Sequence, residues 1–423
     1  MKLPLFVLAS ILMQTGCQRP AIHGKSTPRP PSQHTDSEAI RQRTVRMRAV
    51  LEKAALTAPK DPQPQFELAM FDRMTGDAAA ASSRLLGITT NHPKYERAAY
   101  HLGMIALQNG AAKEAAQWLS RAAAALPDDP QVLTNASVAL LRAGNPSEAK
   151  RLAESALKRD DRFPDAYLVL ARIEDQERRY ESALAHLRRY EVLAPNPSPG
   201  FYLMGRIYHV RADGKNAEES LRKAIEADPE NPEVHALLGR VYLEHFGVMR
   251  MDDAIRTLSQ AVKLNPQHPT ANYHLGQALA NVGRNEEAVA ALQAALKTSP
   301  EPGPVHYELY QTLLQLGRKD EAAIHLSKHR EFQTYTSTFN RLSTEIDRNP
   351  RDPKYRFKLV DFCLKERQPK AAELVLQEAV REVPSAAASF YRKLAHVYEQ
   401  MGREDLATRA RDAAYLKERG RGG

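Results

Sequence analysis

The sequence predicts an all-α protein built from repeated two-helix segments, and two sets of regularly spaced residues indicate this. Prolines, with one Asp in the series, recur every 34 residues at Pro59, Pro93, Pro127, Asp161, Pro195 and Pro229, then at Pro266 and Pro300, and then at Pro350 and Pro384. Glycines keep the same interval at Gly76, Gly110 and Gly144, and again at Gly283 and Gly317. Because glycine favours the backbone conformation that ends a helix and proline stops one, each period holds two short helices.

Composition and charge exclude several classes of protein. Of the 423 residues, 43% are hydrophobic and 26% are charged, which is typical of soluble globular chains. Of the net charge of +9, residues 18–60 carry +6, Lys2 carries +1 and residues 403–423 carry +2, so the body from 61 to 402 is neutral. A nucleic-acid-binding surface needs basic residues spread over its face, so we expect no nucleic-acid partner. Two cysteines, Cys17 and Cys363, are too few for a disulfide framework or a cysteine zinc site.

The first segment of the chain has the pattern of an export signal. An apolar run from Leu3 to Met13 is too short to span a bilayer as a helix. Together with Gly16 and Cys17 it resembles a bacterial lipoprotein signal, although Gln14 stands where that family usually has Leu. The resemblance implies cleavage after residue 16 and a lipid on Cys17. A plain signal peptide and an uncleaved anchor are the alternatives.

The segment after Cys17 predicts a tether and then a basic helix. Residues 17–35 are rich in Pro, Ser and Thr and lack apolar periodicity, which indicates an extended linker. Residue 18, directly after the cysteine, is Gln rather than Asp. By resemblance to the sorting signals of Gram-negative lipoproteins, this favours the outer membrane. Residues 36–61 are expected to form a basic helix that makes up half a repeat. Its basic residues either contact anionic lipid head groups or form a solvated face.

One repeat, from Pro269 to Pro300, illustrates the expected hairpin. The first helix carries an apolar stripe, and Gly283 follows where it ends. The second helix carries its own stripe, and Pro300 stops it. Small residues let two helices approach closely, so the repeat predicts a tight antiparallel pair. The residues of the two stripes are Tyr273, Leu275, Gly276 and Leu279, and Ala288, Leu292, Ala295 and Leu296.

These residues resemble the tetratricopeptide repeat, which has small residues at its eighth, twentieth and twenty-seventh positions and Pro near its end. The matches in this repeat are Gly276, Ala288, Ala295 and Pro300. Preceding repeats match at Gly239, Ala254, Ala261 and Pro266, at Gly205, Ala217, Ala224 and Pro229, and at Gly103, Ala115, Ala122 and Pro127. The resemblance implies a right-handed α-solenoid of about ten hairpins. We expect eight repeats in 62–336, an extra helix or spacer in 337–352 and two repeats in 353–421.

In the tetratricopeptide family the first helix of each hairpin lines a concave groove, mainly through positions two, five, nine and twelve. The resemblance places the arginine series Arg172, Arg206 and Arg240 at position nine, and Tyr100, Tyr202, Tyr273 and Tyr307 at position five. Earlier repeats place Phe66, Met70, Met104, Val138 and Leu141 there, which predicts an apolar stretch. Arginine and tyrosine suit acidic or extended protein segments. Alternatively, the arginines pair with Glu174, Asp175 or Glu244 and only solvate the face.

No signature of catalysis or cofactor binding accompanies the repeats. The sequence has no phosphate-binding glycine loop and no nucleophile motif, and we expect no cofactor and no small-molecule substrate. His325 and His329 have metal-ligand spacing on a helix, but no HExxH motif includes them, and we expect no metal site. A three-residue insertion near Phe246–Met249 is expected to form a longer turn that packs on itself, with a partner site as the alternative.

These observations favour a non-enzymatic scaffold or assembly factor that is exported, lipid-anchored at Cys17 and facing the periplasm. Protein partners would lie in the groove. One alternative is a structural component of a secretion, pilus or polysaccharide-export machine. Another is a cytoplasmic regulator of an enzyme, with an N-terminus that is not a signal. A carbohydrate-active enzyme would need a pair of catalytic carboxylates, and the sequence indicates no site for them.

Overall fold

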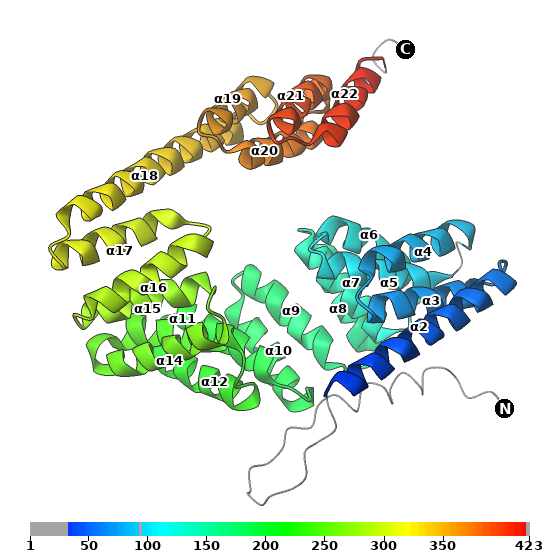
Figure 1. Cartoon of the computed structure of the whole chain (residues 1–423), viewed down its shortest axis with the longest axis horizontal. Helices are drawn as coiled ribbons and strands as arrows, with labels where there is room; N and C mark the ends of the chain where they lie inside the picture. Colours follow the sequence, from blue (N-terminus) through cyan, green and yellow to red (C-terminus); the bar gives the residue numbers. More distant parts are fainter. Residues whose placement is uncertain (1–32, 93–94, 420–423) are drawn as a thin grey trace, which may run out of the picture. The chain divides into compact units, whose positions relative to one another are not determined.

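A computed structural model describes residues 33–92 and 95–419, with side chains from residue 41 onward, and all its regular structure is helical. A 25-residue helix, α2 (Gln33–Thr57), precedes ten successive helical hairpins (Figure 1). The first five are α3/α4 (Pro62–Met74, Ala78–Asn91), α5/α6 (Glu96–Gln108, Ala112–Ala125), α7/α8 (Pro130–Arg142, Pro146–Arg159), α9/α10 (Pro164–Gln176, Tyr180–Leu193) and α11/α12 (Ser198–Val210, Gly214–Ala227).

The other five hairpins follow in the same alternation. They are α13/α14 (Pro232–Val241, Met251–Leu264), α15/α16 (Pro269–Asn281, Asn285–Thr298), α17/α18 (Pro302–Gln315, Lys319–Arg348), α19/α20 (Pro353–Lys365, Pro369–Glu382) and α21/α22 (Ala387–Gln400, Glu404–Arg419). The chain divides into two compact units between Ser155 and Ala156, inside α8. Within the described ranges, none of the helices combines the length and the apolar character that a membrane span requires.

Local sequence accounts for where the helices begin and end. Asp61, Asp129, Asn231 and Asp352 each accept a hydrogen bond from a backbone N–H of the first turn, and a proline follows each of them at the first helical position. The predicted glycines have positive φ angles between the two helices of a hairpin, for example +77° at Gly283. Hairpins without that glycine keep the same backbone conformation, at Arg178, Ala212 and Arg367. The hairpin geometry therefore tolerates some loss of its preferred residue.

The predicted close approach of the two helices occurs at a glycine and leucine pair. A Cβ atom on Gly276 would lie 2.5 Å from Leu292 Cγ, across the α15/α16 hairpin. Three other hairpins repeat this contact, between Gly103 and Leu119, Gly205 and Leu221, and Gly239 and Leu258. All four leucines are fully buried. In these four hairpins the two helices therefore approach closely, as the small residues predict.

The extra helix or spacer expected in 337–352 is not a separate element. Residues Lys319–Arg348 form one continuous helix, α18, which packs on α17 through its first half and on α19 through its second half. The sequence between these bounds has no Gly or Pro, so nothing interrupts the helix after the eighth hairpin. The prediction counted the additional residues correctly and placed a break where the chain has none.

Candidate binding face

The first helices of successive hairpins lie beside one another in the second unit. Neighbouring helices in the series α9, α11, α13, α15 and α17 contact each other, so residues at equivalent positions form rows across them. We call this surface the first-helix face. It carries the arginine series and three of the four predicted tyrosines, and it is the candidate binding surface of the second unit.

Two arginines of the series have carboxylate partners on this face. Arg206 binds Asp175 of the preceding first helix, and Arg240 Nε donates to Glu244 Oε1 at 2.7 Å. These are the pairs that the solvated-face interpretation expects. The side chains of Arg206 and Arg240 nevertheless remain 44% and 41% exposed, so both still face solvent. Arg172 is also exposed and interacts within the chain.

The two carboxylates respond differently to their surroundings. Burial raises the pKa of Asp175, and the nearby Arg206 offsets this only in part. Burial also acts to raise the pKa of Glu244, but the hydrogen bond and charge of Arg240 outweigh it and hold that pKa below its usual range. At Asp175 the effect of burial thus prevails, whereas at Glu244 the contact with Arg240 prevails.

Two of the three position-five tyrosines on this face, Tyr273 and Tyr307, accept hydrogen bonds from amide side chains. Gln277 Nε2 donates to the Tyr273 hydroxyl at 3.0 Å, and Gln311 Nε2 donates to Tyr307 at 2.8 Å. Tyr202 and Tyr273 are half-buried, and burial raises the pKa of both. Tyr307 is 41% exposed. Their rings thus form fixed, partly open surfaces that suit flat contacts with a partner.

The apolar residues predicted for the first unit are divided between core and surface. Phe66 is only 2% exposed and packs edge-on against Tyr95, so its ring supports the surface from beneath. Other members of this set are half-buried on the first helices α3, α5 and α7: Met70, Met104, Val138 and Leu141. Tyr100 lies in the same row, and its hydroxyl accepts a hydrogen bond from Asn135 of the next first helix at 2.7 Å.

The predicted lipidation residue, Cys17, lies outside the described residues.

Sequence reasoning did not identify the polar cross-links between first helices. Gln277 also donates to Glu308 of α17 at 2.8 Å, which connects two hairpins as Asn135 and Tyr100 do. Gln277 occupies the same ninth position as Arg206 and Arg240. Extending the position count by one repeat would have found it. The ninth-position row therefore continues from the arginines to a residue with an amide side chain.

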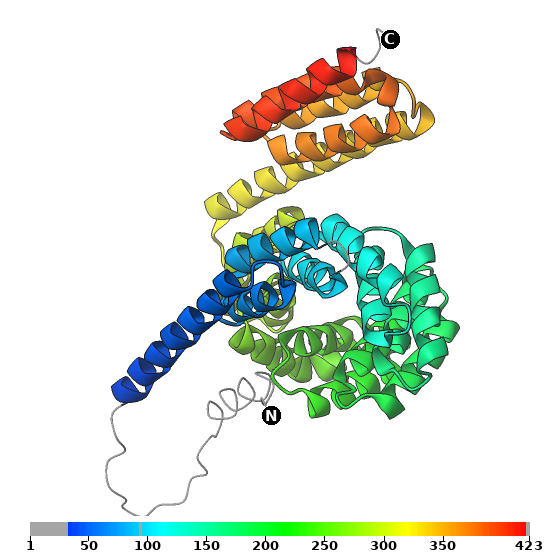
Figure 2. The same ribbon diagram turned by 90° about the vertical axis from the view of Figure 1, so that its right-hand side faces the viewer.

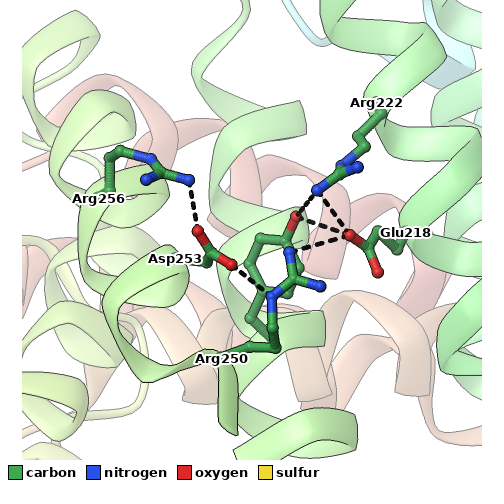
Figure 3. A network of polar contacts seen from close by, with 6 residues as sticks. Glu218, Arg222, Arg250, Asp253 and Arg256 are labelled. Carbon is green, nitrogen blue, oxygen red and sulfur yellow. Dashed lines mark hydrogen bonds and ion pairs between the residues drawn. The ribbon is translucent and has the colours of Figure 1, made fainter.

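The insertion in the sixth hairpin forms an unusual turn. Tyr242–Phe246 is a π-helix and Gly247–Arg250 is a 3-10 turn between α13 and α14. Arg250 stacks over the Tyr242 ring at 4.6 Å and donates to Glu218 at 3.1 Å, in the network of Figure 3. Asp253 binds both Arg250 and Arg256 there.

This turn packs on itself only in part. Phe246 lies against the core of the second unit, as the expectation of a self-packed turn requires. Val248 and Met249 are instead 88% and 84% exposed at the tip. The three inserted residues force a wider helical turn, and the arginine network fixes its base while the tip remains in solvent.

The histidines of the eighth hairpin have separate partners. His325 Nδ1 lies 2.8 Å from His306 Nδ1, whereas His329 Nδ1 lies 2.8 Å from the Gly303 carbonyl oxygen. Burial and the neighbouring His325 lower the pKa of His306 to about 4. Over the described ranges, no group of three or more His, Cys, Asp or Glu residues is arranged to hold a metal ion. These imidazoles connect α17 to α18.

Comparison with known proteins identifies the repeat. Family models described as "Tetratricopeptide repeat" match residues 74–130, 134–197, 250–301 and 280–334, and a second model of that description matches 199–231. Together they cover more than half of the chain. The chain therefore belongs to the tetratricopeptide repeat family, whose members are generally non-enzymatic scaffolds for protein interaction. No curated protein matches the sequence.

Several solved structures are similar to parts of this chain. PilF of Pseudomonas aeruginosa is 18% identical over 48% of this chain and 96% of its own, with a TM-score of 0.44. A tetratricopeptide repeat protein from Parabacteroides merdae is 14% identical over 60% of this chain and 98% of its own, with a TM-score of 0.48. MamA is 21% identical over 40% of this chain and 96% of its own, with a TM-score of 0.36. Each of these likenesses concerns the repeat fold alone.

Proposed function

We propose that this protein is a binding scaffold that holds a segment of a partner protein on the first-helix face of its second unit. The observation that supports this most directly is the set of half-exposed side chains on neighbouring first helices, with Arg206 and Arg240 at position nine and Tyr202 at position five. Repeats present these groups at regular intervals along neighbouring helices. A partner can therefore contact several of them at once without any chemical step.

The side chains define the chemistry of the partner. A guanidinium binds a carboxylate through two parallel hydrogen bonds, and a tyrosine ring offers flat contact area. Because Asp175 and Glu244 already bind the two arginines, an incoming carboxylate competes with an internal one. Such an exchange gives selectivity and moderate affinity, which suits reversible holding of an acidic segment.

We further propose that the protein works at the bacterial envelope, attached by a lipid on Cys17 and facing the periplasm. The support is the apolar run from Leu3 to Met13 followed by Gly16 and Cys17. Mass spectrometry of the mature N-terminus, with Cys17→Ala as control, tests this directly. An unmodified N-terminus on a soluble chain would refute the anchor and leave the binding face unaffected.

Photo-crosslinking tests the binding face in cells. A benzoylphenylalanine at Tyr202 should capture a partner protein, whereas one at Lys223, exposed on the second helix α12, should not. Equal capture from both positions would refute the assignment of the face. Capture of several proteins in fixed stoichiometry would favour a structural component of an envelope machine.

Substitution of the arginines then tests the chemistry. The double variant Arg206→Ala/Arg240→Ala should weaken the captured complex by about tenfold or more and reduce its salt dependence. Each substitution removes a charge-assisted hydrogen bond to the partner. The matched control Arg222→Ala/Arg256→Ala removes two exposed arginines from the second helices α12 and α14. It should leave affinity unchanged, and equal losses in the two variants would contradict the proposal.

A further inference from the structure

Helix α2 is only partly covered by the rest of the first unit. Leu51 and Ala55, in its C-terminal half, are buried with Leu68 of α3. Arg48 adds an ion pair, because its Nη2 lies 2.8 Å from the fully buried Asp72 carboxylate. The N-terminal half of the helix extends beyond the first hairpin (Figure 2). Half of α2 thus has a surface that no neighbouring helix of this unit covers.

Among the α2 side chains that the structure describes, basic residues outnumber acidic ones on the uncovered surface. Glu52 is the only acidic residue of α2 whose side chain the structure describes, and it pairs with Arg48 at 3.3 Å. Valines interrupt the basic residues and are also exposed. We call this surface the outer face of α2; it consists of Arg41, Arg43, Val45, Arg46, Val50 and Lys53. Within the described part of the chain, no carboxylate pairs with any of its four basic residues.

We propose that the outer face of α2 binds the surface of an anionic lipid bilayer. Positive charges near such a surface are attracted by its potential, and each Lys or Arg in contact strengthens binding about fivefold. Exposed valines between the charges suit the boundary between head groups and acyl chains. A second copy of this chain would present the same positive face and be repelled, so dimerisation through α2 is disfavoured.

The length of chain before α2 places this face near a membrane. This step rests on the proposed lipid at Cys17. Residues 18–32 separate that cysteine from the first residue of α2, and a linker of this length, if flexible as the composition predicts, spans on the order of 20 Å on average. The helix therefore stays within a few Debye lengths of the bilayer, where weak electrostatic contacts are effectively concentrated.

Vesicle binding of the full-length Cys17→Ala chain tests the inference without the lipid. The vesicles are phosphatidylcholine alone or phosphatidylcholine with about 30 mol% phosphatidylglycerol, an anionic content chosen to give a negative surface potential. The test variant is Arg41→Gln/Arg43→Gln/Arg46→Gln. The matched control is Arg330→Gln/Arg348→Gln/Arg409→Gln, which removes three exposed arginines from the second unit. Since the apolar run at Leu3–Met13 remains in every chain, differences between them report α2.

We expect the parent and control chains to bind anionic vesicles at least about tenfold more tightly than neutral ones, and the α2 variant to lose that preference. Raising the salt concentration should weaken the preference. Equal binding to both kinds of vesicle, or equal loss in the two triple variants, would overturn the inference. A dimer that the α2 variant alone dissociates, measured by light scattering, would assign the face to a second copy instead. Acylation of Cys17 is measured separately, so failure of the anchor and failure of the α2 contact are distinguishable.

Discussion

Replacing Gly276 with Ala tests the contact that defines each hairpin. The added Cβ would lie 2.5 Å from Leu292 Cγ and 2.8 Å from its Cδ2, closer than real Cβ contacts allow. Leu292 is fully buried, so it has little room to move, and overpacking of this kind costs about 1 to 3 kcal/mol. Alanine also favours a helix over glycine by roughly 1 kcal/mol. We therefore expect a net loss of about 1 kcal/mol in the local stability of α15/α16.

Gly87→Ala provides the matched control. Gly87 lies inside α4, where nothing approaches within 4 Å of the new Cβ, so only the gain in helix propensity remains. This variant should be stabilised by about 0.5 to 1 kcal/mol. In the double variant Gly276→Ala/Leu292→Ala, the loss of stability should be smaller than the sum of the losses in the two single variants. The shortened side chain at position 292 makes room for the new Cβ.

Native-state hydrogen exchange measures these effects hairpin by hairpin. A repeat array need not unfold in one step, so a local free energy of opening is more informative than a single midpoint. Amides of α15 and α16 should exchange faster in Gly276→Ala, and amides of α4 should exchange more slowly in Gly87→Ala. Unchanged or slower exchange in Gly276→Ala would refute the close-approach argument.

Two further predictions concern ionisable groups. Asp72→Ala removes the buried carboxylate that binds Arg48 and Arg84, so we expect a loss of about 2 kcal/mol and faster hydrogen exchange in α2; wild-type exchange rates there would contradict this. The pKa of His101 and of His306 is lowered to about 4, first by burial, so the folded state binds fewer protons than the unfolded state. Stability should be full above about pH 6.5 and fall as the pH is lowered towards 4, by on the order of 3 kcal/mol per histidine at most. In chemical denaturation, His306→Gln should reduce that pH dependence; an identical slope would refute the assignment.

The repeated part of the fold could be predicted because its causes are local. Proline, glycine and cap residues act within a few positions of themselves, and their period predicts the ten hairpins. The run from Lys319 to Arg348 shows the limit of this reasoning. Residues beyond the length of a repeat indicate additional helix. Those residues continue the preceding helix when no Gly or Pro separates them from it. The sequence contained that information, since no Gly or Pro occurs there.

The sequence could predict which residues lie on the candidate face, but not which partners their side chains have. Counting positions selects which residues lie on first helices, and Arg206, Arg240, Tyr202 and Tyr273 do lie there. Partners depend on side-chain conformations between neighbouring repeats, which the period does not determine. Phe66 satisfied the same count and is nevertheless buried. The π-helix at Tyr242–Phe246 could not be predicted either, because an insertion reveals its length and not its conformation.

The pairing of Arg240 with Glu244 offers a way to separate a binding arginine from one that only solvates the face. If the guanidinium binds carboxylates of a partner, Glu244 competes with them, and Glu244→Gln should strengthen binding of an acidic probe by about two- to fivefold, as expected for an exposed ion pair. A fluorescein-labelled polyglutamate peptide serves as the probe in fluorescence anisotropy at low salt. The control Glu287→Gln breaks the exposed pair with Arg284 at the start of α16 and should have no effect. Equal affinities for wild type and both variants would show that Arg240 only solvates this surface, and the contacts of Tyr202 and Tyr273 would then have to account for binding.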